Sequence, residues 1–415
     1  MVLFIVSLLV LGVQLYIAPH TMSRVDIAYY LRDAREIVDR RHYFDFYRHT
    51  VYEYPPLWAY YISLVYLIHP VTNRRDPGFL TLIKIPLILS DVILGILLFY
   101  YVRREVGSRK ALLYSTLLLL HPHMLFISAM WGMNDSICAM FLFSSIFLLR
   151  DGNIWKSAVL MGLALLVKQY AAFPLVFILA LILKKYGRSE ACAFLLTAFS
   201  PLFVISIPYL LADPEPYLRA ITFNVSEPQL DIRLKSGVFW RFIKYVIENH
   251  TTIDTPPWLT LPQYPLFALG FLLVLLFFYS RIPSNRKEAY SFVVNDAVLL
   301  SVLYFLIFCP VVHPQWYVLL MPFVCVRLAL MKKGSEILWY IPTLLPFIHH
   351  FVFTSSIRFD STEPLDTFIH MVWAFRSETA AFWYIPIRTG IFVGLLALFL
   401  RLLVFYEKDL HSLDS

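Results

Sequence analysis

The stretch that decides the fold runs from residue 80 to residue 102, reads LTLIKIPLILSDVILGILLFYYV, and is followed by Arg103-Arg104. Lys84 and Asp91 carry its only charges. The hydrocarbon core of a bilayer is about 30 Å thick, and about 20 consecutive, mostly apolar residues span it as a helix. This stretch therefore predicts a membrane-spanning helix with two charges inside it.

The composition of the whole chain extends that prediction. Of the 415 residues, 59% are apolar and 15% are charged, whereas soluble domains carry about 25% charged residues. A net charge of +7 would suggest a nucleic-acid partner in a soluble protein. Here the basic residues lie in short loops between apolar segments, where they orient a protein in the membrane. We therefore expect membrane lipids, and no nucleic acid, as partners.

The four cysteines all fall inside apolar runs, at Cys138, Cys192, Cys309 and Cys325. Their spacing fits neither a disulfide framework nor a metal-ligand set. We therefore expect no required cofactor, and the sequence alone leaves dependence on a divalent metal open.

Apolar segments alternate with short loops along the chain. They lie at 1–19, 80–102, 111–130, 136–149, 154–167, 170–183, 191–211, 264–280, 290–309, 315–331, 335–353 and 383–404. Basic residues follow alternate segments: Arg103-Arg104 with Arg109-Lys110, Arg150 with Lys156, Lys184-Lys185 with Arg188, Arg281 with Arg286-Lys287, Arg327 with Lys332-Lys333, and Arg401 with Lys408. Short basic loops stay in the cytoplasm. The pattern predicts an all-α, multi-pass membrane protein with about twelve spans and both termini cytoplasmic.

The outer face then carries three hydrophilic loops, at 20–79, 212–262 and 354–382. We divide the chain accordingly into a first module at 1–211, an external loop at 212–262 and C-terminal transmembrane helices at 263–415. The apolar segment 57–69 is too short to span, so we expect an interfacial or re-entrant helix on the outer side.

An amphipathic helix is predicted within the first loop. Its apolar residues repeat at helical spacing: Ile27, Leu31, Ala34 and Val38. Charged residues fill the other face: Arg32, Asp33, Arg35, Glu36, Asp39 and Arg40. Such a helix is expected to lie along the membrane surface.

Three polar turns are expected below the outer surface. The segments 154–167 and 170–183 supply about 14 residues each, or roughly 21 Å of helix, so the turn at 168–170 between them lies at depth. The segment 136–149 is equally short, which places the turn at 131–135 at depth too. A third polar turn, 312–317, opens on the same side. Irregular or charged backbone at that depth is tolerated only around a buried or water-filled cavity, so we expect one outward-facing cavity.

Several of these polar residues have a structural reading as well. Lys84 and Asp91 lie on nearly the same helix face, where an internal ion pair is as reasonable as contact with substrate. Lys168 has a structural alternative, and His313 has one as a helix cap. A packing network or a cavity wall would suit Trp131, Asn134 and Asp135, which are expected on one helical face. Asn295 and Asp296 are read as packing residues.

Asp26 stands at the expected start of the surface helix, shortly beyond the first apolar segment. A carboxylate there is favoured by the helix dipole alone. The functional alternative is a general base at the mouth of the cavity.

Together these residues resemble the GT-C class of membrane glycosyltransferases that use polyprenyl-phosphate sugars. The resemblance covers residues 1–331 and rests on Asp26, Asp33-Ala34-Arg35, YEYPPL at 52–57, Lys84, Asp91, WGMNDS at 131–136, KQY at 168–170, Asp231-Ile232-Arg233 with Lys235-Ser236, and HPQWYVLLMP at 313–322. The order of these motifs looks most like the first mannosyltransferase of GPI-anchor assembly. The WG-x-x-D and KQ elements also resemble the dolichyl-phosphate-glucose glucosyltransferases of N-glycan assembly. This chain departs from the mannosyltransferase pattern at residue 26, where one acidic residue replaces an Asp-x-Asp pair.

The resemblance implies an inverting glycosyltransferase that moves a sugar, expected to be mannose, from a polyprenyl- or dolichyl-phosphate donor. The acceptor would be a lipid-linked glycan or glycolipid on the extracytoplasmic or lumenal side, and a small membrane subunit would be a further partner. The membrane would be the cell membrane in a prokaryote or the endoplasmic reticulum membrane in a eukaryote.

The resemblance also suggests roles for individual residues. Asp26 would be the catalytic base, and the donor phosphate would bind Lys168, Arg233 and His313. The donor or its sugar would contact Trp131, Asn134, Asp135, Gln169, Gln315 and Tyr317. An acceptor-side or structural role falls to Glu53, Tyr54, Lys84, Asp91 and Lys235. The alternative function is a transporter or lipid flippase, although the two halves of the chain lack the internal symmetry typical of transporters.

Overall fold

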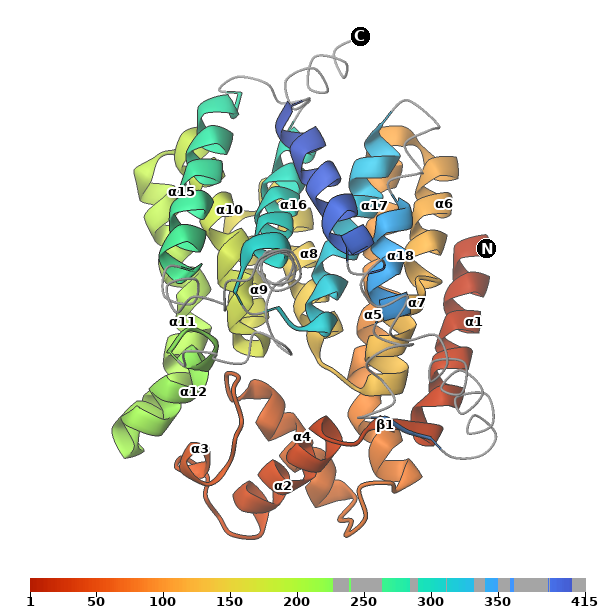
Figure 1. The fold of residues 1–415 in the computed structure, drawn as a ribbon, viewed down its shortest axis with the longest axis vertical. Coiled ribbons are helices and arrows are strands. Elements are labelled where there is room, and N and C mark those ends of the chain that lie inside the picture. Colours follow the sequence, from red (N-terminus) through yellow and green to blue (C-terminus); the bar gives the residue numbers. More distant parts are fainter. Residues whose placement is uncertain are drawn as a thin grey trace, which may run out of the picture.

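The computed structural model describes residues 1–226, 239, 263–283, 290–310, 312–331, 340–349, 359–361, 387 and 389–404. The described part is mostly helical, and its long helices run between two ends of a bundle (Figure 1). The N-terminal half contains α1 (Val2–Ile17), η1 (Ala18–His20), β1 (Thr21–Ser23), α2 (Asp26–Val38), α3 (Phe46–His49), α4 (Leu57–Ile68), α5 (Pro77–Val106), α6 (Ser108–Leu119), α7 (Pro122–Leu125), η2 (Phe126–Trp131), α8 (Asp135–Arg150), α9 (Ile154–Val167), η3 (Gln169–Ala171) and α10 (Ala172–Tyr186). The remainder contains α11 (Arg188–Ala212), α12 (Pro214–Ser226), α15 (Gln263–Arg281), α16 (Tyr290–Phe308), η5 (Pro314–Leu319), α17 (Leu320–Leu330), α18 (Ile341–Ile348), β2 (Phe359–Ser361) and a helix at 389–404.

Six of the described helices are long and apolar enough to cross a bilayer, and further apolar helices are shorter. The longest is α5, which contains the stretch quoted first. Its start is defined by Asp76, whose side chain accepts a hydrogen bond from the Phe79 N–H, and by Pro77 in the first turn. Gly107 ends it with a φ of 85°, a backbone conformation that glycine adopts without strain. The count of about twelve spans stays a prediction.

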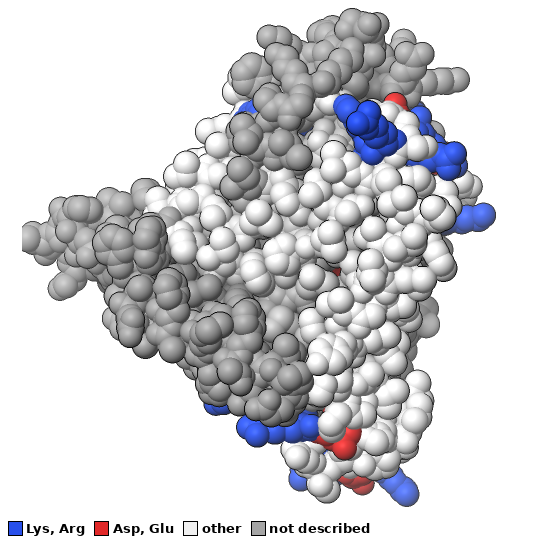
Figure 2. All heavy atoms as spheres, turned by 90° about the vertical axis from the view of Figure 1, so that its right-hand side faces the viewer, with Lys and Arg blue, Asp and Glu red and all other residues white. Residues whose placement is uncertain are grey.

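The basic loops gather at one end of the bundle. Arg104 at the end of α5 is 2.7 Å from Asp151 in the turn after α8, and the Lys110 ammonium donates to the Met331 carbonyl at 2.9 Å. The opposite end carries α2, α3 and α4 (Figure 1). Figure 2 shows the charged side chains of one face near these two ends, with an uncharged band between them. This arrangement fits a bundle that crosses a membrane with its basic loops on one side.

One of the basic residues assigned to the cytoplasmic loops is buried between two helices. The sequence analysis places Arg327 in a short cytoplasmic loop. In the structure it lies inside α17, its side chain is 1% exposed, and it is 3.1 Å from Asp296 of α16. The neighbouring Asn295 donates to the Phe323 carbonyl at 3.3 Å. The expectation that Asn295 and Asp296 are packing residues is therefore confirmed, and the loop position of Arg327 was wrong because its counter-charge lies on another helix.

The amphipathic helix exists as α2, but the protein covers its apolar face. Ile27, Leu31 and Ala34 are buried, and α2 packs on α4. Two residues of the predicted polar face, Asp33 and Glu36, are buried as well. The prediction that α2 lies along the membrane surface did not include this packing. Its apolar side faces other helices of the same chain, mainly α4, which is the predicted short helix 57–69.

The helices below the outer loop pack closely. A Cβ atom on Gly162 of α9 would lie 2.5 Å from the Ala198 carbonyl of α11. Only glycine permits this approach. The short helix α9 is thereby held against the longer α11.

Candidate active site

The turn between α9 and η3 places a buried ammonium beside a buried carboxylate. Lys168 Nζ lies 3.7 Å from Asp135 Oδ2, and both side chains are fully buried. Lys168 is in extended conformation, with φ −150° and ψ 122°, where α9 has already ended. The pair thus joins two of the three polar turns predicted to meet, those at 131–135 and 168–170.

Aromatic side chains bring the third turn to the same place. The Tyr170 hydroxyl donates to Asp135 Oδ1, and its ring centroid lies 4.9 Å from that of Trp316 in η5. His313 lies at the N-terminal end of η5 with its ring 4.9 Å from Trp316. The three turns therefore converge beneath the outer loop, as the sequence predicted.

Asp26 lies at the same end of the bundle as these three turns. It is the first residue of α2 and is partly exposed. The Trp131 Nε1–H donates to its Oδ2 at 2.7 Å, and the Ser23 hydroxyl donates to the same oxygen. Its distance from Lys168 and Asp135 is short enough for electrostatic interaction with both. The structure thus places Asp26 at the same end of the bundle as the buried pair.

The outer loop covers Lys168 with an aromatic ring. Lys168 Nζ lies 3.4 Å from the centroid of the Tyr54 ring. The next residue, Gln169, donates its amide to the Glu53 carbonyl at 2.9 Å. Residues 53 and 54 therefore hold the outer loop on the turn. The sequence predicted that Lys168 opens to the outside, whereas the structure encloses it.

The turn at 131–135 does not form one helical face, in contrast to the prediction. The chain leaves the helix at Gly132, which has a φ of 86°, and α8 begins at Asp135. Trp131 points to Asp26, whereas Asp135 points to Lys168. Between them, Asn134 is fully buried, and neither polar atom of its amide has a hydrogen-bond partner in the described part of the chain. The shared face was wrong because it was derived from helical spacing, which Gly132 interrupts.

Lys84 and Asp91 are held separately by the first helix and its end. Lys84 Nζ donates to the Ala18 carbonyl at 2.8 Å and also to the Thr21 carbonyl. Asp91 accepts from the Gln14 amide at 3.1 Å. The alternative of an internal ion pair between Lys84 and Asp91 was wrong, since each side chain finds a polar partner on the N-terminal segment. Both residues fix the chain that leads into Asp26.

The remaining predicted residues fall into two groups. Gln315 and Tyr317 are buried in η5, and the Tyr317 ring lies 6.3 Å from His123. Arg233 and Lys235 lie outside the described residues. Sequence reasoning missed Ser23, which donates to Asp26 three residues later, and Trp316, whose ring contact with Tyr170 joins segments far apart in the chain.

A hollow of about 560 Å³ lies on the outer side, beside α2. Its lining includes Arg32, Arg35, Glu36 and Arg74. The Asp33 carboxylate lies 3.3 Å from the guanidinium of the lining residue Arg32, its neighbour in sequence. Burial raises the pKa of Asp33 to about 7, against the opposing effect of the Arg32 charge. This carboxyl is therefore poised to change protonation near neutral pH.

The sequence profile of glycosyltransferase family 87 matches residues 52–310. No curated protein matches. The structure of ArnT from Cupriavidus metallidurans bound to undecaprenyl phosphate is similar over 100% of this chain and 77% of its own, with a TM-score of 0.53 and 15% identity. The apo form of ArnT gives a TM-score of 0.52 and 16% identity, over 99% of this chain and 75% of its own. The archaeal oligosaccharyltransferase AglB from Archaeoglobus fulgidus, in complex with an inhibitory peptide and a dolichol-phosphate, gives 0.44 and 12%, over 93% and 56%.

Proposed function

The chain belongs to glycosyltransferase family 87, and we propose that it transfers a sugar from a polyprenyl- or dolichyl-phosphate donor to a lipid-linked glycan or glycolipid. The reaction takes place on the extracytoplasmic side and inverts the anomeric configuration. The observation that carries the proposal is the position of Asp26, a partly exposed carboxylate that Trp131 holds at the end of the bundle where Lys168 and Asp135 are buried. The shared fold with ArnT, whose structure contains undecaprenyl phosphate, supports the donor class.

Asp26 is the base that removes the proton from the acceptor hydroxyl. Its two donors, Trp131 and Ser23, both bond Oδ2 and fix the direction of the carboxylate. The leaving group is a phosphate, which needs little protonation. One carboxylate is therefore enough, in contrast to glycosidases, which need a second carboxyl as general acid.

Lys168 supplies positive charge for the departing phosphate, because a fixed cation in a water-poor site stabilises developing charge strongly. In the described structure its ammonium has the Tyr54 ring and the Asp135 carboxylate as neighbours, with Asp135 beyond hydrogen-bond distance. Donor binding then requires Tyr54 to move aside. His313 and Arg233 are further candidates for phosphate contacts.

The sugar contacts the turn at 131–135. Asn134 offers an unpartnered buried amide that can donate and accept, which suits a sugar hydroxyl better than an apolar lipid chain. Gln169, Gln315 and Tyr317 orient the donor from the other two turns. Mannose is the proposed sugar, on the resemblance to the GPI mannosyltransferase. Cytoplasmic termini and a small membrane subunit also belong to this proposal.

The direct test is transfer by the purified chain from radiolabelled dolichyl-phosphate mannose, in parallel with dolichyl-phosphate glucose, in membranes that supply glycolipid acceptors. We expect label in a lipid-extractable product from the mannose donor and little from the glucose donor. Transfer from dolichyl-phosphate glucose, with none from dolichyl-phosphate mannose, would refute mannose as the transferred sugar. Transfer from a nucleotide sugar, with none from either lipid donor, would refute the donor class.

A further inference from the structure

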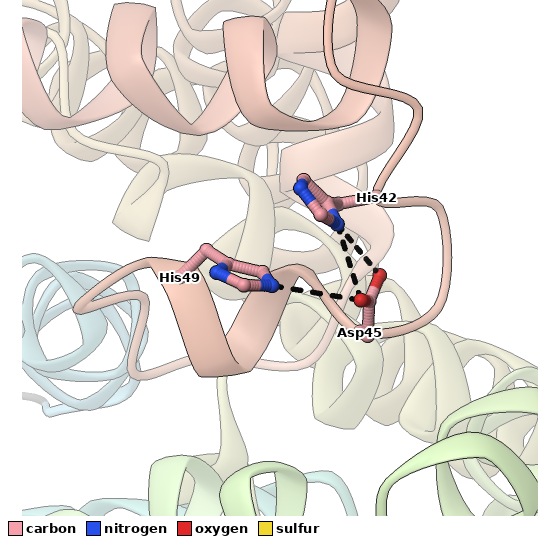
Figure 3. Close-up of side chains that lie close together, drawn as sticks. All are labelled: His42, Asp45 and His49. Atoms are coloured by element: carbon pink, nitrogen blue, oxygen red, sulfur yellow. Dashed lines mark hydrogen bonds and ion pairs between the residues drawn. The ribbon is translucent and has the colours of Figure 1, made fainter.

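Three side chains of metal-binding type meet on the outer surface, apart from the transfer site. Figure 3 shows His42, Asp45 and His49 pointing toward one another from the turn after α2 and from α3. His42 Nδ1 lies 3.1 Å from Asp45 Oδ2, and His49 Nε2 lies 3.5 Å from the same oxygen. All three ligand atoms lie within 4.8 Å of one another.

We propose that His42, Asp45 and His49 bind a divalent transition metal of the Zn²⁺ class, which fixes α3 to the preceding turn. Two imidazole nitrogens and one carboxylate oxygen are ligands that suit zinc. Ligands about 2.1 Å from a tetrahedral zinc are about 3.4 Å apart. Two of the three separations already have this size, so small side-chain rotations complete the site.

The arrangement suits a metal better than a simple hydrogen-bond pair. Both imidazoles face one carboxylate oxygen, and their ring centroids lie only 4.0 Å apart. One metal ion can bind both rings at this separation. The side chains are 30%, 43% and 36% exposed, in chain order, so an ion has access from solvent and water can fill the remaining coordination position.

The position of α3 indicates a structural role for the metal. The helix has only four residues, too few to be stable alone. It carries Tyr47 into a cluster of rings, 5.2 Å from Tyr209 and 5.1 Å from Tyr217, and Arg48 onto Asp213 at 2.7 Å. A metal bound by these ligands would therefore stabilise the short helix whose Tyr47 and Arg48 attach the outer loop to the junction of α11 and α12.

The chain offers a matched control in the same loop. His69 Nε2 lies 2.7 Å from Asp76 Oδ1, and the His69 side chain is 41% exposed, similar to His49. This pair has one histidine and one carboxylate, so it lacks the third ligand. His69→Ala removes a surface histidine of the same kind and leaves the proposed site complete.

The experiment uses full-length protein purified with a tag that contains no histidine, stripped with EDTA and dialysed against Zn²⁺. We expect about one zinc ion per chain by elemental analysis, in the wild type and in His69→Ala. His42→Ala and His49→Ala should bind zinc more than about tenfold less tightly, because even the loss of a residue that only supports a metal ligand typically costs that much. Equal zinc affinity in all four proteins, or no zinc on the wild type, would overturn the proposal.

Limited digestion with trypsin reports on the same site without an activity assay. Arg40, Arg41 and Arg48 lie beside or within the proposed site. Zinc should slow cleavage at these residues in the wild type and in His69→Ala, and it should have no such effect in His49→Ala. Protection by zinc that persists in His49→Ala would contradict the assigned ligands. Because neither readout depends on transfer, failure here leaves the proposed function untouched.

Discussion

Two buried ion pairs lie in opposite halves of the bundle, and they differ in the distance between their charges and in the asparagine beside each pair. Asp296 and Arg327 are 3.1 Å apart between α16 and α17, toward the basic loops, and the Arg327 guanidinium lies 4.0 Å from the Phe292 ring centroid. Lys168 and Asp135 are 3.7 Å apart at a turn under the outer loop. Asn295 beside the first pair bonds to a backbone carbonyl, whereas the Asn134 amide beside the second has no partner in the described residues.

The comparison shows why burial of charge is a poor guide to function by itself. Two charges removed from water cost several kcal/mol each, and their attraction repays this only with good geometry. The Asp296–Arg327 pair has a short contact and joins two packed helices, as a structural pair should. The charges of the Lys168–Asp135 pair are farther apart, and the Asn134 amide beside the pair has no partner in the described residues, as expected for a site prepared for a polar ligand.

The largest effect is expected from Arg327→Met. Removal of one partner leaves Asp296 buried and uncompensated, which typically costs about 3–5 kcal/mol. We expect a large fall in the melting temperature of the detergent-solubilised protein. The double variant Asp296→Leu with Arg327→Met should recover much of it, because it removes both charges. A stable but inactive single variant would break the distinction between the two pairs.

Lys168→Ala should lower transfer strongly and should destabilise the fold less than Arg327→Met does, because Asp135 keeps its hydrogen bond from Tyr170 and lies 3.7 Å from Lys168. Loss of one group that stabilises developing charge typically lowers the rate by about 10²–10³-fold. We expect kcat/KM to fall in this range, with donor binding weakened more than acceptor binding. The measurement is steady-state transfer with each substrate varied in turn. Equal weakening for donor and acceptor would count against a phosphate contact at Lys168.

Tyr54 tests whether the covering ring matters as a ring. A cation next to an aromatic face gains about 0.5–2 kcal/mol. Tyr54→Phe keeps this contact and should change transfer little. Tyr54→Ala removes it and should change donor KM severalfold, in either direction, since the ring both holds the cation and covers it. Identical kinetics for both variants would show that the loop does not control access to Lys168.

The smallest effect is expected from Asp33→Asn and depends on pH. The folded-state pKa of Asp33, about 7, is above the ordinary 3.8 because the carboxyl is buried. The folded protein therefore binds this proton more tightly than the unfolded chain, and the contribution to stability is lost as pH rises from about 4 to about 7. Asp33→Asn should remove this part of the pH dependence and raise the melting temperature at pH 8. A wild-type stability that rises over this interval, with no difference in the variant, would contradict the assignment.

Much of the architecture follows from the sequence because short apolar segments leave little freedom in depth. The lengths of 136–149 and 154–167 placed two turns at depth, the alternation of basic loops placed them on the same side, and the structure brings them together. Periodicity also predicted α2, but it does not reveal what covers each face, so the burial of Asp33 was missed. Arg327 was misplaced for a similar reason, since a basic residue near the end of an apolar segment looks the same whether it faces solvent or Asp296.

The candidate site was predictable as a set of turns and not as a set of contacts. The side chains at 131 and 135 point to different partners because Gly132 breaks the helix, and no local pattern foretells the bond from Trp131 to Asp26. These contacts arise only when η1 and β1, held by Lys84, bring residue 26 back over the bundle.

The account rests most directly on Asp26, and one assay of Asp26→Asn tests it. Asparagine keeps an oxygen for the Trp131 N–H but is no base, and loss of a general base typically costs about 10²–10⁴-fold in rate. Asp39→Asn, on the residue just after α2, is the matched control, because its carboxylate accepts from Tyr66 away from the proposed site. We predict that Asp26→Asn binds the lipid donor normally and fails to transfer, while Asp39→Asn transfers as the wild type does. Transfer by Asp26→Asn at near the wild-type rate would contradict the account.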